Sequence, residues 1–199
     1  MKPSLSKVCG VLALLALVGA PLRAEVKTGD QAPDFALAGS DGKVHKLSDY
    51  KGQVVIVAWF PRAFTGGCTA QCDSLRVSGI EKGFDVKLLG FRQFTVAARD
   101  TGSGLDKFDV AFFTASVDKA EINKRYAEYL KLDYPVLSDP EKKTARAYGV
   151  VNDKRPVPFR WTYIIGADGK VLHVDKQVST KTHGADLVKK LKELGVKQK

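Results

Sequence analysis

The run of residues 53–60 (QVVIVAWF) constrains the fold of this 199-residue chain more than any other segment. It is continuously apolar and rich in β-branched side chains, which is typical of a strand buried on both faces. Pro61 ends the run, and a helix is predicted from about Gly67 through Leu75. Residues 109–117 (DVAFFTASV) form a second run of the same kind. A strand, a helix and a strand in this order indicate parallel strands joined by a right-handed crossover.

The remaining elements extend this unit into a larger sheet. Further helices are predicted at residues 120–130, 141–148 and 185–194, and hairpins with Asp-Gly turns at 32–47 and 160–174. The segment Leu137–Pro140 is predicted as a turn. This order predicts an α/β fold of the thioredoxin-like type. It has a mixed central sheet, helices on both faces and an N-terminal β-hairpin.

Apolar residues at helical spacing indicate the buried faces of two of these helices. They are Ile122, Tyr126 and Leu130 in the first, and Leu187, Leu191 and Leu194 in the last. Residues 80–104 do not fit the order, because they can be read as a helix or as short strands. Residues 78–86, at one edge of this segment, resemble residues 103–110 at the other edge. We therefore predict an insertion at 80–104, for which the sequence indicates no function.

Residues 1–24 have the layout of a secretory signal peptide. A basic start precedes a mainly apolar stretch at residues 8–20, and a small residue, Ala24, stands at the expected cleavage point. The stretch is short for a membrane span, and Cys9 lies before it, whereas a lipoprotein signal needs its cysteine after it. A buried N-terminal helix is the alternative. We expect a periplasmic or secreted mature domain, residues 25–199, with no stable membrane anchor.

Removal of the signal would leave Cys68 and Cys72 as the cysteines of the mature domain, in a compartment where a disulfide persists. Cys68 stands at the expected N-terminus of the helix that follows the first buried strand. Free backbone N–H groups and the positive end of the helix dipole stabilise a thiolate at such a position. The position therefore suits a nucleophile better than a structural thiol.

The residues around Cys68 resemble the active-site motif of the peroxiredoxins, the thiol peroxidases of the alkyl hydroperoxide reductase and thiol-specific antioxidant group. The family pattern Pro-x-x-x-Thr-x-x-Cys matches Pro61, Thr65 and Cys68. Gly66 stands where many members have proline. The family's later arginine matches Arg160, which opens the segment RWTYIIGADGK. The resemblance runs from about residue 29 to residue 195, outside the insertion.

This resemblance implies a role for each matching residue. Cys68 would attack one oxygen of a hydroperoxide and become a sulfenic acid, while the other oxygen leaves as water or alcohol. The hydroxyl of Thr65 would align the peroxide, and Arg160 would stabilise the thiolate and the charge on the breaking O–O bond. Pro61 would shield the intermediate from water. No metal, haem or flavin cofactor is implied.

The implied partners are a hydroperoxide substrate and an external thiol reductant such as a thioredoxin-like protein. The resemblance is also compatible with a homodimer. Cys72 is the candidate resolving cysteine, and a small buried side chain is the alternative. Side chains four residues apart in a helix have Cβ atoms roughly 6 Å apart, whereas a disulfide needs about 3.8 Å. A Cys68–Cys72 bond therefore requires the first helical turn to unwind, and the family usually places this cysteine five residues on.

Two other functions use similar cysteine pairs. Copper-binding assembly factors of the SCO type also have Cys-x-x-x-Cys after a buried strand, but they need a histidine where this chain has Arg160. Dithiol–disulfide oxidoreductases of the periplasm normally use Cys-x-x-Cys. The net charge of +10 comes from lysines and arginines spread along the chain, which predicts a solvated face and no nucleic-acid partner.

Overall fold

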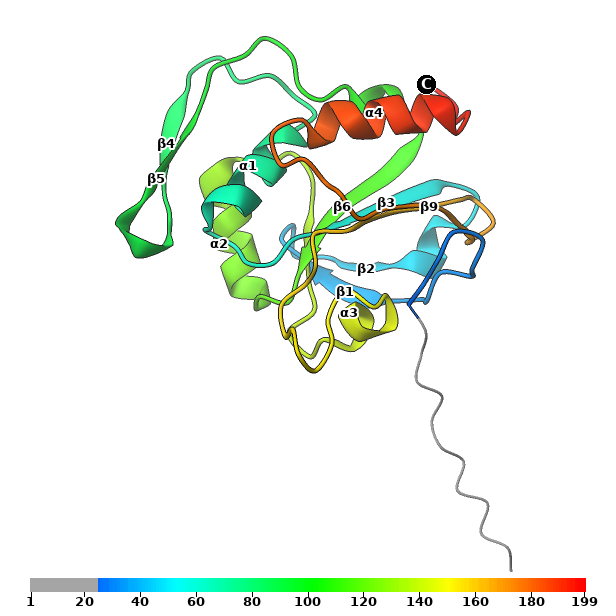
Figure 1. The fold of residues 1–199 in the computed structure, drawn as a ribbon. Coiled ribbons are helices and arrows are strands. Elements are labelled where there is room, and N and C mark those ends of the chain that lie inside the picture. The colour runs from blue at the N-terminus through cyan, green and yellow to red at the C-terminus, as the bar shows by residue number, and fades with distance from the viewer. Residues whose placement is uncertain (1–24) are drawn as a thin grey trace, which may run out of the picture.

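The computed structural model describes residues 25–199, so the predicted export signal lies outside the described residues. A seven-stranded mixed sheet has the order β2-β1-β7-β6-β3-β8-β9, and β4 and β5 form a separate pair (Figure 1). The strands are β1 (Ala36–Gly39), β2 (Val44–Lys46), β3 (Val54–Trp59), β4 (Phe84–Lys87), β5 (Gln93–Val96), β6 (Val110–Ser116), β7 (Val136–Ser138), β8 (Thr162–Ile165) and β9 (Val171–Asp175).

The α-helices are α1 (Gly66–Ser74), α2 (Ala120–Leu130), α3 (Lys143–Ala147) and α4 (His183–Glu193). Short 3-10 helices span Leu47–Tyr50, Leu89–Phe91 and Leu105–Lys107. Within the described part of the chain, no helix has both the length and the apolar character needed to cross a membrane.

Strand β3 lies inside the sheet, as its sequence predicts, and is buried from Val55 to Trp59. It pairs in parallel with β6 and antiparallel with β8. The antiparallel pairing brings the start of β8 beside the end of β3, with Thr162 opposite Ala58. Residues that follow β3 and residues that precede β8 therefore meet at one edge of the sheet.

Alternate side chains of β3 point to opposite faces of the sheet and enter different parts of the core. Val55, Val57 and Trp59 pack on the face that α3 covers. Ile56 and Ala58 point to the other face, where buried residues of α1, α2 and α4 pack. The predicted mixed sheet with helices on both faces is confirmed.

Some local predictions are wrong. Leu137 belongs to strand β7, not to a turn, because β7 pairs in parallel with β6 and antiparallel with β1. Ile122 and Leu194 are 36% and 37% exposed, so the buried stripes of α2 and α4 are narrower than their spacing predicts. The inward residues of these helices are Tyr126, Leu130, Leu187 and Leu191.

Residues 80–104 form an arm built on a two-stranded hairpin, which decides between the helix and strand alternatives. β4 and β5 pair antiparallel and extend away from the main sheet (Figure 1). At the root of the arm, the backbones of Ile80 and Arg99 exchange hydrogen bonds of 2.7 and 2.8 Å. The chain leaves and rejoins the domain at neighbouring points, so we propose that this arm is an insertion.

Candidate active site

Cys68 lies in the first turn of α1, directly beyond the end of β3. Its side chain is buried, with the residue 2% exposed. The Nη2 atom of Arg160 lies 3.5 Å from the sulfur of Cys68, although the two residues are 92 positions apart. The pairing of β3 with β8 explains this contact, because Arg160 stands two residues before β8. A cationic donor and the N-terminus of a helix thus meet at one sulfur.

The guanidinium of Arg160 is held by a second contact. Its Nη1 atom donates a hydrogen bond to Oε1 of Gln71, a fully buried residue three positions after Cys68 on α1. The amide nitrogen of Gln71 in turn lies 3.5 Å from the carbonyl oxygen of Trp59, at the end of β3. This chain of contacts fixes the guanidinium plane, so that one nitrogen faces Gln71 and the other faces Cys68.

The loop between β3 and α1 carries the other two motif residues. Pro61 opens the loop and is partly buried, and Thr65 precedes α1. The hydroxyl of Thr65 donates a 3.0 Å hydrogen bond to the carbonyl oxygen of Arg62, and it does not cap the helix. Its oxygen therefore keeps lone pairs for another donor. The backbone N–H of Ala63 donates to Asp118 at 2.8 Å, which ties the loop to the end of β6.

Phe64 is strained, with a φ of 57° in the left-handed region. Such a conformation costs a bulky residue about 1 to 3 kcal/mol and persists only where its surroundings hold it. Its ring packs edge-on against Tyr126 and Tyr129, with centroids 5.0 and 6.0 Å away. Its carbonyl oxygen accepts a 2.8 Å hydrogen bond from the N–H of Leu89, at the tip of the hairpin arm. The arm therefore helps to hold the loop that precedes Cys68.

Cys72 is a buried free thiol in the last turn of α1, and Cys68 is also free. Burial raises the pKa of Cys72 to about 12, and the neighbouring Cys68 adds to the shift. The hydroxyl of Tyr134 donates a 2.7 Å hydrogen bond to the Cys72 carbonyl oxygen and holds the backbone there. While α1 is intact, Cys72 is thus neutral and a poor nucleophile.

The structure brings three of the five sequence-predicted residues, Cys68, Cys72 and Arg160, around α1. Thr65 and Pro61 lie in the adjoining loop. Sequence reasoning missed Gln71, which links Arg160 to the end of β3. Its position three residues after Cys68 was the available signal, because residues three apart share a helix face. Nothing local to the sequence indicated that Tyr134 reaches the Cys72 backbone.

His183, at the start of α4, is a buried group near Arg160. Its Nε2 atom lies 3.0 Å from the hydroxyl oxygen of Thr162, and its Nδ1 atom has no partner within residues 25–199. Burial lowers the pKa of His183 from 6.5 to about 4; Asp186 opposes this shift, and the charge of Arg160 adds to it. His183 is therefore neutral at pH 7.

This burial predicts a loss of stability in weak acid. Between pH 6.5 and 4 the unfolded chain protonates this histidine and the folded protein does not, so the free energy of unfolding falls as the pH falls. Between pH 7 and 5 we expect the wild type to lose about 2 kcal/mol more than His183→Gln. Urea unfolding of both proteins at the two pH values measures the difference, and parallel pH profiles would contradict the prediction.

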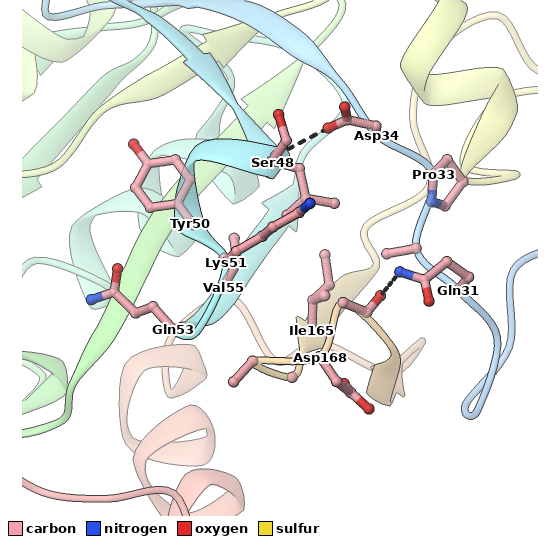
Figure 2. Close-up of a pocket in the computed structure, with 15 residues that line it drawn as sticks. Gln31, Pro33, Asp34, Ser48, Tyr50, Lys51, Gln53, Val55, Ile165 and Asp168 are labelled. Carbon is pink, nitrogen blue, oxygen red and sulfur yellow. Dashed lines mark hydrogen bonds between the residues drawn. The ribbon is translucent and has the colours of Figure 1, made fainter.

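One cavity lies beside the loop that precedes Cys68, and another lies far from Cys68. One, of about 490 Å³, lies beside the loop and is lined by apolar residues such as Phe64, Leu88 and Ile122 and by cations such as Arg125. The other, of about 700 Å³, lies around the start of β3 and the end of β8, so it is at the opposite end of β3 from Cys68. Figure 2 shows this second cavity, with Asp34 accepting a 3.2 Å hydrogen bond from the backbone of Ser48.

No group of three or more His, Cys, Asp and Glu side chains is placed to hold a metal ion anywhere in residues 25–199. The group that joins the cysteine at this site is the guanidinium of Arg160. A guanidinium has no lone pair for a metal and donates hydrogen bonds only. The arrangement therefore favours stabilisation of an anionic sulfur or oxygen.

Comparison with known proteins finds relatives that match most of this chain. The family described as Redoxin matches residues 27–192. Peroxiredoxin Bcp from Escherichia coli strain K12 is 32% identical over 174 residues, which cover 84% of this chain and 97% of the relative. Peroxiredoxin Bcp from Bacillus subtilis is 26% identical over 179 residues, which cover 86% of this chain and 99% of the relative.

Solved structures show the same fold. Peroxidoxin BcpB from Mycobacterium tuberculosis aligns with a TM-score of 0.66 and 24% identity, covering 85% of this chain and 99% of that structure. The Xanthomonas campestris bacterioferritin comigratory protein, characterised for alkyl peroxide reduction, aligns with a TM-score of 0.64 and 17% identity. That alignment covers 85% of this chain and 97% of the Xanthomonas chain.

Proposed function

The chain belongs to the peroxiredoxin family and is a thiol peroxidase, and from this premise we propose that Cys68 is its peroxidatic cysteine. The observation that supports this most is the 3.5 Å approach of Arg160 to a sulfur in the first turn of α1. A nucleophilic sulfur needs an environment that favours its anion, and both groups supply positive potential. The family assignment favours peroxidase chemistry over the copper-binding and dithiol–disulfide alternatives.

We propose the following first step. The thiolate of Cys68 attacks one oxygen of a hydroperoxide ROOH, the O–O bond breaks, and the departing oxygen takes a proton and leaves as ROH. The sulfur gains a hydroxyl group and becomes a sulfenic acid. Arg160 stabilises the negative charge that moves onto the departing oxygen, and Gln71 keeps the guanidinium in place. The hydroxyl of Thr65 is the proposed contact that orients the peroxide.

The substrate is proposed to include alkyl hydroperoxides as well as hydrogen peroxide. The cavity of about 490 Å³ beside Phe64 has room for an apolar substituent. Phe64 and Leu88 line this cavity and also belong to the apolar cluster around Cys68. An alkyl group lying there would remain next to the loop that precedes the reactive sulfur.

In the second step, we propose that Cys72 resolves the sulfenic acid. The sulfur of Cys72 attacks the sulfur of Cys68, the hydroxyl group leaves with the Cys72 proton as water, and a disulfide forms. An external dithiol, such as that of a thioredoxin-like protein, then reduces the disulfide and returns both thiols. Because both cysteines lie in α1, this step requires part of the helix to unwind.

Replacement of Cys72 tests this function directly. In Cys72→Ser, one equivalent of hydrogen peroxide or an alkyl hydroperoxide should be consumed as fast as in the wild type. The Cys68 sulfenic acid should then persist, and turnover with a dithiol reductant should fall at least about tenfold. Stopped-flow kinetics and mass spectrometry of the trapped adduct measure both effects. Cys68→Ser is the matched control, and a Cys68 sulfenic acid that disappears equally fast without Cys72 would sink the resolving role.

We also propose that residues 1–24 direct export and that the protein works in the periplasm or outside the cell. The basic start and short apolar stretch support this proposal. A disulfide cycle is compatible with such a compartment, provided that an exported reductant is present. N-terminal sequencing of the protein recovered from its producing cell checks the cleavage near Ala24.

A further inference from the structure

The hairpin arm is bonded to the helix that carries both cysteines. Arg99, at the root of the arm, donates hydrogen bonds from Nη1 to Oδ2 of Asp73 at 3.0 Å and from Nη2 to Oδ1 at 3.0 Å. The same Nη2 also donates to the backbone carbonyl oxygen of Asp73 at 2.7 Å. Asp73 directly follows Cys72 and stands in the last turn of α1. One arginine therefore binds both the side chain and the backbone of the residue next to Cys72.

The ion pair between Arg99 and Asp73 is partly shielded from solvent, and a second arginine lies beside it. The side chains of Arg99 and Asp73 are 28% and 13% exposed. The Nε atom of the buried Arg76 also lies 3.7 Å from Oδ1 of Asp73 and adds a second positive charge. The backbone pairing of Arg99 with Ile80 fixes the root of the arm and directs Arg99 toward α1. A bidentate, partly buried ion pair of this kind is stronger than an exposed one.

Cys72 stands in the last turn of α1. Cys72 is fully buried, and its distance from Cys68 in an intact helix is too long for a disulfide. Unwinding that extends beyond the first turn to the C-terminal end of α1 would release Cys72, and Arg99 binds at that end. The Arg99 contacts at Asp73 must break for this release.

We propose that Arg99 is a positioning residue that keeps the last turn of α1 folded and thereby slows the attack of Cys72 on oxidised Cys68. This inference rests on the proposed function, because it needs Cys68 as the oxidised sulfur and Cys72 as its resolving partner. It gives the hairpin arm a role: the arm sets how long the Cys68 sulfenic acid survives.

The lifetime of the sulfenic acid decides between two products. In the resolving reaction, the Cys68 sulfenic acid and the Cys72 thiol give a disulfide and water. In the competing reaction, the sulfenic acid reacts with a second hydroperoxide ROOH, gains one oxygen to become a sulfinic acid, and releases ROH. Slower unwinding of α1 leaves more time for the second reaction. Arg99 therefore shifts the protein toward sulfinic acid at high peroxide concentration.

The test measures disulfide formation after rapid mixing with peroxide, by acid quench, thiol alkylation and mass spectrometry. In Arg99→Ala, the disulfide should form about tenfold faster, and about tenfold more peroxide should be needed for half conversion to sulfinic acid. Arg99→Lys keeps the charge without the bidentate geometry, so its rate should lie between the two. Arg146→Ala, which removes an exposed ion pair with Asp153, is the matched control and should match the wild type.

Repeating the substitution in a Cys72→Ser protein separates an effect of Arg99 on Cys72 from a general loosening of the fold. If Arg99 acts through Cys72, then Arg99→Ala should leave sulfinic acid formation unchanged in a Cys72→Ser protein. An equal effect in both backgrounds would overturn the inference, as would an unchanged or slower disulfide rate in Arg99→Ala. A wild type that consumes peroxide but forms no Cys68–Cys72 disulfide would overturn both this inference and the resolving role. A wild type that consumes no peroxide would instead count against the proposed site.

Discussion

Cys68→Ser should lower the rate constant for peroxide consumption by at least about 1,000-fold, which corresponds to about 4 kcal/mol of transition-state stabilisation. A serine hydroxyl remains protonated near neutral pH and needs a base to become a nucleophile. The polar group that contacts position 68 is the guanidinium of Arg160, which only donates hydrogen bonds and accepts no proton. Within residues 25–199, no base is therefore hydrogen-bonded at position 68 to activate a serine. Stopped-flow mixing with hydrogen peroxide and with an alkyl hydroperoxide measures the loss.

The matched control for this experiment is Cys72→Ser, which removes the other thiol of α1 and keeps Cys68. It should still reduce one equivalent of peroxide, so the pair of variants separates attack on peroxide from resolution. Serine is smaller and more polar than cysteine, so circular dichroism should confirm that both variants fold. If Cys68→Ser consumed peroxide as fast as the wild type, the reactive sulfur would not be that of Cys68.

The sequence predicts the part of the site that depends on strand order. A buried run at 53–60, a helix carrying Cys68 and a late strand after Arg160 are each visible locally. The resemblance to the peroxiredoxins implies that Arg160 meets Cys68, and the pairing of β3 with β8 explains how they meet. The motif residues could be identified because their types and spacing resemble the peroxiredoxin active-site pattern.

The rest of the site depends on tertiary contacts that have no local signature. Gln71 looks like an ordinary helical residue until the structure shows its oxygen at Arg160. Arg99 lies in a segment whose strands could equally be read as a helix, so the sequence could not show that it reaches Asp73. The strand β7 was missed because it has only three residues and is followed by turn-forming residues. Its pairing with β6 and β1 outweighs this local preference.

Arg160→Met should lower the rate constant for the first step by about 100- to 1,000-fold, or about 3 to 4 kcal/mol. Methionine keeps much of the apolar length of the side chain and removes the charge, so the change tests electrostatics at nearly constant packing. The guanidinium lies 3.5 Å from the Cys68 sulfur in a partly buried setting, where a charge interacts more strongly than in water. Single-turnover stopped-flow kinetics in the Cys72→Ser background isolates this step, because resolution is absent there.

Arg160→Lys and Gln71→Ala distinguish charge from orientation. Lysine keeps the positive charge, but a single ammonium group cannot reproduce the two-nitrogen contact with Gln71 and Cys68. It should therefore recover only part of the rate lost in Arg160→Met. Gln71→Ala keeps the whole guanidinium and removes the contact that directs it, so we expect a smaller loss of about tenfold. Full activity in Arg160→Lys would mean that charge alone is sufficient. Full activity in Arg160→Met would mean that the α1 N-terminus stabilises the reacting groups without Arg160.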